Sequence, residues 1–373
     1  MTSLSRPSRL AALIAVAVLP LGALTACTGS SSKASTSSSA STSSAASTSG
    51  AGSTSGGATT TAAAVAAAGG TALSDGFGSR GKNRNVYFLT YYDPASDAFW
   101  NQILTGAKDA AKLGNLKFTT QTAEADTTKM TDLVNTAIAT KPAEMFIPFN
   151  DPSWENAACQ ASKAGIAVIA YNVPPAGVAK ACIKGFVGQD FFTVGAIIGQ
   201  QLIKQVSLKA GDKVLCPAEE PSQQYAIQRG GGVDSVLKTV GVKCTFLRTS
   251  GDDGPTLDAL TTWLTANPTV KAIVPLGGTP HRNAVKAEDA ASVKVPIIGF
   301  DTSPQVIAGI KSGRILATAD QQGYIQGFQS VMQGVLFLDF ALSPANINSG
   351  GNALIDKNTV GNLEDKALQG VRW

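Results

Sequence analysis

Short apolar runs alternate with helical patterns of apolar residues from Asn85 to the end of the chain. Runs such as Val86-Tyr87-Phe88-Leu89 are typical of buried strands, whereas apolar residues three and four positions apart mark one face of a helix. The predicted strands cover residues 86–89, 116–120, 145–147 and 166–170, and then 213–216, 243–247, 272–275, 295–300 and 315–318. The predicted helices are one that ends at Gly114, and then 127–140, 152–163, 191–205, 223–239, 256–265, 282–291, 305–311 and 323–340.

These elements form two successive series, and the second series starts with the helix predicted from residue 191. A strand–helix–strand succession at this spacing gives right-handed crossovers and a parallel sheet that helices cover on both faces. The sequence therefore predicts an α/β fold with two Rossmann-like lobes of three layers each.

The start of the chain has the order of parts that an export signal needs. Arg6 and Arg9 precede an apolar run over residues 10–24, and small residues lead to Cys27. The run is shorter than the roughly 20 apolar residues that span a bilayer, which disfavours a membrane anchor helix. Leu24-Thr25-Ala26-Cys27 resembles the lipobox of bacterial lipoproteins. The resemblance implies that residues 1–26 are a signal peptide and that a lipid on Cys27 anchors the protein to the extracytoplasmic face of the cell membrane.

The segment after Cys27 is almost wholly Ser, Thr, Ala and Gly up to about residue 70, and it contains no aromatic residue. Such a segment buries too little apolar surface to offset the entropy of ordering. We therefore expect a flexible stalk over residues 27–84, which holds a soluble domain above the membrane.

Charge in the remainder of the chain is nearly balanced. Arg6, Arg9 and Lys33 precede the first acidic residue, Asp75, so that 27 cations face 26 anions from Asp75 onward, with no basic stripe. This distribution argues against a nucleic-acid partner. With 44% hydrophobic and 15% charged residues overall, the roughly 290 residues after the stalk suffice for two globular lobes.

Four cysteines remain once Cys27 is assigned to a lipid: Cys159, Cys182, Cys216 and Cys244. An even number in an exported chain indicates two disulfides. Three connectivities are possible, and pairing of sequence neighbours would keep each disulfide within one lobe. The spacing matches no compact zinc site, and the single histidine, His281, is expected in a loop, so we expect no metal and no cofactor.

Polar and aromatic residues gather directly after the predicted strands. Ligands of open α/β sheets bind at the carboxyl ends of the strands. Carboxylates, amides and an arginine beside aromatic rings suit a sugar, because its hydroxyls need donors and acceptors and its C–H faces need a flat ring. The strand-end residues are Tyr91, Tyr92, Asp93, Asp97, Phe99, Trp100, Phe149, Asn150, Asp151, Trp154, Tyr171, Asn172, Gln223, Gln224, Arg229, Thr279, His281, Asp301, Thr302, Asp320, Gln321 and Gln322.

Five motifs at these strand ends follow one another in a specific order. They are Asp97-Ala98-Phe99-Trp100, Phe149-Asn150-Asp151, Gln228-Arg229-Gly230, Gly299-Phe300-Asp301 and Ala317-Thr318-Ala319-Asp320-Gln321. Their succession over residues 85–342 resembles the ribose-type periplasmic sugar-binding proteins, the substrate receptors of ABC importers. The resemblance implies two lobes joined by a hinge of several strands, with the ligand between them.

The resemblance also implies a set of ligand-binding residues: Asp97, Phe99, Trp100, Asn150, Asp151, Arg229, Thr279, Asp301 and Gln321. Two positions depart from the family pattern. Asn150 stands where relatives have Asp, and Leu276-Gly277-Gly278 stands where they have Asn-Asp, so Thr279 is expected to replace one amide contact. Asp301 has an alternative role as the N-cap of the helix predicted from residue 305, although Ser303 is available for that role.

By the pattern of the same family, the chain crosses between the lobes near Gln189, Gln321 and Ser343. Residues 85–188 and 322–342 then form the N-terminal lobe, and residues 189–321 and 343–373 form the C-terminal lobe.

The implied function is that of a monomeric substrate-binding lipoprotein, which captures a monosaccharide or polyol and delivers it to the membrane permease of an ABC importer. Two alternatives stay open: a lipid-anchored receptor for a sugar-like signal, and an exported glycoside-acting enzyme with Asp97 and Asp301 as its two carboxylates. Sugar-responsive repressors share the two lobes, but they begin with a helix-turn-helix where this chain has its export signal.

Overall fold

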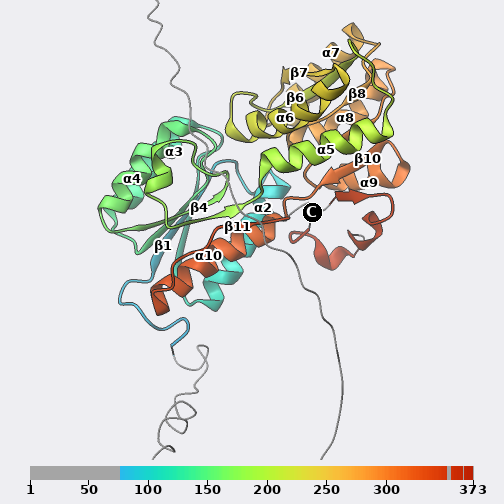
Figure 1. The fold of residues 1–373 in the computed structure, drawn as a ribbon. Helices are drawn as coiled ribbons and strands as arrows, with labels where there is room; N and C mark the ends of the chain where they lie inside the picture. The colour runs from blue at the N-terminus through green and yellow to red at the C-terminus, as the bar shows by residue number, and fades with distance from the viewer. Residues whose placement is uncertain (1–75, 351–353, 364, 373) are drawn as a thin grey trace, which may run out of the picture. The chain divides into compact units, whose positions relative to one another are not determined.

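The computed structural model describes residues 76–350, 354–363 and 365–372, and these residues form two sheets with helices on both faces (Figure 1). The first sheet has the strand order β11-β5-β4-β3-β1-β2, and all of its strands are parallel. The second sheet has the order β12-β10-β9-β8-β6-β7. This arrangement confirms the predicted α/β fold with two three-layer lobes.

The first lobe consists of the first sheet and the helices that pack on it. Its strands are β1 (Asn85–Thr90), β2 (Lys117–Thr122), β3 (Glu144–Ile147), β4 (Ala167–Asn172), β5 (Gly185–Gly188) and β11 (Ile347–Asn348). Its helices are α2 (Ala98–Leu113), α3 (Thr127–Ala139), α4 (Glu155–Lys163) and α10 (Gly323–Phe340), with short 3-10 turns η1 (Pro152–Trp154) and η2 (Val178–Ala181). Helices α2 and α10 lie side by side (Figure 1).

The second lobe repeats this plan around the second sheet. Its strands are β6 (Lys213–Ala218), β7 (Lys243–Arg248), β8 (Ala272–Ile273), β9 (Ile297–Phe300), β10 (Ile315–Ala319) and β12 (Leu354–Asp356). Its helices are α5 (Phe191–Gln205), α6 (Gln224–Leu237), α7 (Asp253–Ala266), α8 (Gly278–Ala291) and α9 (Pro304–Ser312), with 3-10 turns η3 (Lys238–Val240), η4 (Val360–Leu363) and η5 (Lys366–Leu368). Strand β12 runs antiparallel to β10, so the prediction of a parallel sheet fails at this edge.

Burial along the strands follows from the layers. Every residue of β3 and β4 is buried, as expected for central strands of a sheet covered on both faces. The edge strands β2 and β7 contain no buried residue. The parallel strands end at one edge of each sheet, and the loops at these two edges hold the site described below.

The predicted stalk extends too far toward the fold, because residues 76–84 pack on the first lobe. The backbone N–H groups of Gly78 and Arg80 donate to the Asp339 carboxylate of α10, at 2.6 and 3.1 Å. Arg84 Nη1 lies 2.5 Å from the same carboxylate. The buried carboxylate thus fixes the segment that leads into β1.

The third crossing between the lobes also lies later than the predicted position near Ser343. Ile347 pairs with Val187 and Asn348 with Gly188, so β11 continues the first sheet. The N–H of Phe186 donates to Asn346 Oδ1 at 3.0 Å. The chain therefore stays with the first lobe through Asn348 and joins the second sheet only at β12.

Each lobe contains one disulfide. Cys159 pairs with Cys182 in the first lobe, and Cys216 of β6 pairs with Cys244 of β7 in the second. Of the three connectivities left open by the sequence, the structure has the one that joins sequence neighbours.

The predicted signal peptide, Cys27 and most of the predicted stalk lie outside the described residues. Among the helices that are described, none has both the length and the apolar character needed to cross a membrane.

Candidate functional site

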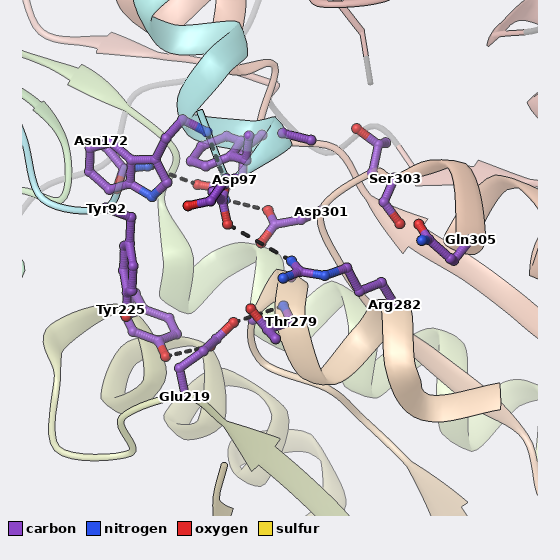
Figure 2. Close-up of a pocket in the computed structure, with 18 of the residues that line it drawn as sticks. Tyr92, Asp97, Asn172, Glu219, Tyr225, Thr279, Arg282, Asp301, Ser303 and Gln305 are labelled. Atoms are coloured by element: carbon purple, nitrogen blue, oxygen red, sulfur yellow. Dashed lines mark hydrogen bonds and ion pairs between the residues drawn. The ribbon is translucent and has the colours of Figure 1, made fainter. Parts of the chain in front are cut away.

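A cavity of about 290 Å³ is lined by loops from both lobes (Figure 2). The loops after β1, β3 and β4 line it from the first lobe, and those after β6, β8, β9 and β10 from the second. Strand carboxyl ends are where open α/β sheets bind ligands. The volume lies at the low end of the roughly 300–1,000 Å³ typical of ligand pockets, so the cavity suits a small molecule.

The first lobe contributes a mainly aromatic wall, formed by Tyr92, Phe99 and Trp100. Asp97 is the N-cap of α2, and its carboxylate accepts a hydrogen bond from Trp100 N at 3.1 Å. This cap fixes the start of the helix and so places Phe99 and Trp100 in its first turn. The Trp100 ring lies 5.9 Å from that of Tyr92 and 6.2 Å from that of Tyr171, so the wall is held by packing between rings.

Asn150 follows β3 and lines the cavity, while its neighbour Asp151 does not. Asn150 is 3% exposed, and its Oδ1 atom has no hydrogen-bond partner in the described part of the chain. A buried acceptor of this kind is costly until a bound molecule or water donates to it. The Asp151 carboxylate instead accepts from Ser153 N at 2.8 Å as the N-cap of η1, which Pro152 begins. Asp151, which was predicted to contact the ligand, is therefore outside the cavity lining.

Asp301 projects from the end of β9 into the cavity with a left-handed backbone, φ +71°. Its N–H donates to Ala319 O at 2.9 Å and its carbonyl accepts from the Thr318 hydroxyl at 2.7 Å, which holds this conformation. The Asp301 carboxylate accepts a hydrogen bond from the side-chain amide of Gln321, which lies just after β10. Ser303 is the N-cap of α9 and accepts from Val306 N, so Asp301 does not serve as the cap of this helix.

Arg229 of α6 is the cationic partner of Asp301, with 3.6 Å between Nη1 and Oδ2. The guanidinium carbon lies 4.6 Å from the centre of the Phe191 ring and 4.4 Å from that of Phe300, and Nη1 donates to Leu276 O at 2.5 Å. Helix α5 packs closely on α6 beside Arg229, because a Cβ at Gly195 would overlap with the Arg229 carbonyl. Arg229 is therefore fixed in direction before any ligand arrives.

Glu219, the residue after β6, is a third carboxylate at the cavity. It accepts from Thr279 N at 2.9 Å and from the Tyr225 hydroxyl at 2.7 Å. A Cβ at Gly277 would overlap with this carboxylate, so Gly277, where relatives were expected to have a side chain, makes room for Glu219. Thr279 contributes its backbone N–H at the first turn of α8, where the helix dipole also favours an anion.

Arg282 and Gln223 connect the second lobe to the first. Arg282 Nη1 lies 3.9 Å from Asp97 Oδ2, and its Nε donates to Asp253 at 2.7 Å. Figure 2 shows Arg282, Asp97 and Asp301 pointing toward one another. Gln223 Nε2 lies 3.2 Å from the Tyr91 hydroxyl.

Burial shifts the pKa of several groups at and beside the cavity, and it raises the pKa of the Tyr92 and Tyr225 hydroxyls as well as that of one carboxyl, Asp97. It raises the pKa of Asp97 to about 6, and the Asp301 and Glu219 carboxylates add to the rise while the Trp100 N–H and Arg282 oppose it. It also lowers the pKa of His281 to about 4. His281 is not a loop residue as predicted, because α8 begins at Gly278 and buries it, with Nδ1 at 2.7 Å from Phe300 O.

The structure brings most of the predicted ligand set to one cavity: Asp97, Phe99, Trp100, Asn150, Arg229, Thr279, Asp301 and Gln321 line it. Tyr92 and Asn172 also line it and were recognisable as strand-end residues. Glu219, Tyr225 and Arg282 were missed. Glu219 had a usable signal, since it directly follows a strand, whereas Arg282 became a cavity residue only because α8 begins one turn earlier than predicted.

Comparison with known proteins gives consistent matches. A family model described as a periplasmic binding protein domain matches residues 86–341. The xylose/arabinose-binding protein of Sulfolobus acidocaldarius is 25% identical over 239 residues, 61% of this chain and 53% of that protein. The D-ribose/D-allose-binding protein of Pseudomonas aeruginosa is 30% identical over 139 residues, 36% of this chain and 43% of that protein. The chain thus matches about half the length of these curated relatives.

A solved structure extends the similarity over more of the fold. The carbohydrate transporter of Acidothermus cellulolyticus, in complex with myo-inositol, is 25% identical with a TM-score of 0.68. The alignment covers 78% of this chain and 100% of that one.

Proposed function

The chain belongs to the periplasmic binding protein family, and on that premise we propose that it captures one monosaccharide or cyclic polyol and delivers it to the permease of an ABC importer. The resemblance seen in the sequence motifs is thereby confirmed at the level of the family. The observation that carries the proposal is that the two lobes line the cavity with two chemically different walls. Asp301, Arg229 and Gln321 form one, and the rings of Tyr92, Phe99 and Trp100 belong to the other.

This pairing of walls matches the chemistry of a sugar. Ring faces take up the C–H surface, while fixed carboxylate and guanidinium groups take hydroxyl donors and acceptors. Relatives named for pentoses, an aldohexose and a complex with myo-inositol support a ligand of this size.

Capture is proposed to proceed by closure of the lobes. The Arg282–Asp97 pair and the Gln223–Tyr91 contact join the lobes without a ligand. A ligand favours the closed arrangement only through groups that it contacts on both lobes at once. Asn150 Oδ1 on the first lobe and Asp301 on the second are proposed as such a pair of contacts.

Binding without catalysis is part of the proposal. A glycoside-acting enzyme needs two carboxylates free to act on one bond. Here Asp301 is held by Arg229 and Gln321, and Asp97 caps α2. These engagements favour recognition over proton transfer or nucleophilic attack. Turnover of chromogenic glycosides by the purified protein would contradict this part.

A panel of pentoses, hexoses, cyclic polyols and amino acids in a thermal-shift assay tests the ligand class. A ligand that binds only the native state raises the melting temperature. We expect at least one sugar or polyol to do so in the wild type and to fail with Asp301→Ala. A shift by amino acids with none by any sugar or polyol would overturn the proposal.

Anchoring by a lipid on Cys27 is a separate part of the proposal and rests on the sequence. Because one acyl chain gives only marginal membrane binding, lasting attachment requires more than one. Mass spectrometry of the mature N-terminus tests this directly, and Cys27→Ala should release the protein or leave its precursor uncleaved. An unmodified mature chain that starts at another residue would contradict anchoring but not sugar binding.

A further inference from the structure

Acidic groups outnumber basic groups around the cavity. Its lining contains the carboxylates of Asp97, Glu219, Asp253 and Asp301, but only the guanidinium groups of Arg229 and Arg282. A neutral sugar would leave this excess of negative charge enclosed.

The short contacts show which carboxylates carry the excess. Arg229 is committed to Asp301, at 3.6 Å, inside a cage of rings. Arg282 makes its short bond to Asp253, at 2.7 Å, and stays 3.9 Å from Asp97. Glu219 therefore makes no ion pair with a described residue, and Asp97 has only the longer contact with Arg282.

Neutral donors hold both of these carboxylates in place. Glu219 accepts from Thr279 N and the Tyr225 hydroxyl, and Asp97 accepts from Trp100 N. They come from opposite lobes, and rings of Tyr92 and Tyr225 line the same cavity. Aromatic faces also attract a cation, which adds to the suitability of this end of the cavity for positive charge.

A further acceptor without a partner points the same way. Asn150 Oδ1 is buried at the cavity and receives no hydrogen bond from the described residues. An ammonium group donates three hydrogen bonds and accepts none, whereas a hydroxyl donates only one. Several acceptors and excess negative charge in one cavity therefore match an ammonium group better than a hydroxyl.

We propose that the cavity selects a monosaccharide or cyclic polyol that bears one ammonium group, which Asp97 and Glu219 receive from opposite lobes. This inference rests on the proposed function and narrows its ligand class. The charged groups that act on Asp97 are Arg282, Asp301 and Glu219, and only the first is cationic. Burial is the main cause of the raised pKa of Asp97, and repulsion by Asp301 and Glu219 adds to it, so a bound ammonium would offset that added repulsion.

Three matched sets of compounds test the proposal by titration calorimetry at pH 7.5. The sets are D-glucosamine, D-glucose and N-acetyl-D-glucosamine; D-galactosamine, D-galactose and N-acetyl-D-galactosamine; and an amino-deoxy-inositol, myo-inositol and the N-acetylated aminocyclitol. In at least one set we expect the amine to bind about tenfold or more tightly than both uncharged members, since hydrogen bonds to charged groups are the stronger ones.

A pair of neighbouring variants separates a charge effect from a structural one. Glu219→Gln should remove most of the preference for the amine while leaving the melting temperature close to that of the wild type. Glu220→Gln is the matched control, because Glu220 lies outside the cavity lining and pairs with Arg248 on the surface. It should leave the preference unchanged.

The outcomes distinguish this inference from the proposed function. Equal or tighter binding of the uncharged member in every set, or a preference that survives in Glu219→Gln, would overturn the inference and leave a neutral-sugar receptor. Binding by none of these compounds, with a thermal shift by another neutral sugar, would overturn it as well. Only the absence of binding by any sugar or polyol would remove the proposed function itself.

Discussion

The two walls of the cavity differ in how far they are built before a ligand arrives. In the second lobe, Asp301 is fixed by Gln321 and Arg229, and Arg229 is fixed by Leu276 O and three rings. In the first lobe, rings pack on one another and Asn150 Oδ1 lacks a partner. The second wall is thus preorganised for directional contacts, while the first offers shape and one unsatisfied acceptor.

This difference suggests a division of labour during capture. Preorganised polar groups cost no reordering when a ligand binds, so the second lobe should supply most of the orientation and affinity. If capture proceeds by the proposed closure, the first lobe should gain a partner for Asn150 Oδ1 only when the lobes close. Substitutions on the two walls should therefore differ in both size and sign of effect.

Among these substitutions, Asp301→Ala should cause the largest loss of affinity. In the proposed binding mode the Asp301 carboxylate accepts from two ligand hydroxyls, each contact worth about 1.5–3 kcal/mol, so affinity should fall by more than about a hundredfold. The substitution also leaves Arg229 buried without its partner, which should cost about 3 kcal/mol of stability. Calorimetry and chemical denaturation measure the two losses. A folded Asp301→Ala protein of unchanged affinity would refute the role of this wall, and Asp301→Asn, which keeps an acceptor for Gln321, should be milder.

Asp97 should make the first wall sensitive to pH. Its carboxyl has a pKa of about 6 in the folded protein but about 3.9 in an unfolded chain. Between these two pKa values the folded state binds more protons than the unfolded chain. The stability that protonation of Asp97 contributes is therefore present at low pH and is lost as pH rises toward about 6. Asp97→Asn should remove about 2 kcal/mol of the fall in unfolding free energy with rising pH, and it should keep the cap of α2. The difference in unfolding free energy between wild type and variant, from pH 4 to 7, measures it; parallel curves would contradict the assignment.

Phe99→Leu tests the aromatic surface itself. The change keeps an apolar side chain of similar length but removes the flat face, and a ring contact is worth about 0.5–1.5 kcal/mol. Affinity should fall by about three- to tenfold, with little change in melting temperature because Phe99 is only partly buried. Phe246→Leu, an exposed ring in the second lobe outside the cavity lining, is the control.

Asn150→Ala should give the smallest loss of affinity, and unlike Asp301→Ala it should not lower the stability of the protein. Removing an unpartnered buried acceptor relieves a desolvation cost, so the ligand-free protein should be as stable as the wild type or more so. Binding should weaken by about three- to fivefold, because one hydrogen bond to the ligand is lost. A lower melting temperature of the ligand-free variant would show that Asn150 serves the fold.

The order of elements and most of the cavity residues could be predicted from the sequence, because both depend on local patterns. Helices α5 and α10 have their predicted bounds, and Asp301 was identified by its place after β9. Ser303 as the cap of α9 removes the alternative role of Asp301.

The failures share a cause: they depend on contacts between distant segments. Residues 76–84 looked like stalk until Asp339, far along the chain, received their N–H groups. Glu219 gained its position from the missing side chain at Gly277. Asp151 is an exception to this cause, because its carboxylate caps the adjacent turn η1. Strand β11 is too short to show a pattern and is defined only by its pairing with β5.

The docking of residues 76–84 on Asp339 determines where mechanical load enters the molecule. Any pull on the preceding chain reaches the fold at α10 and the start of β1, at the end of the first sheet opposite the cavity. The connections between the two sheets follow β5, β10 and β11, so we expect none of that force to pass through them. Tension in a tether should therefore leave the opening and closing of the cavity unchanged, so that surface-held and released protein bind with equal affinity.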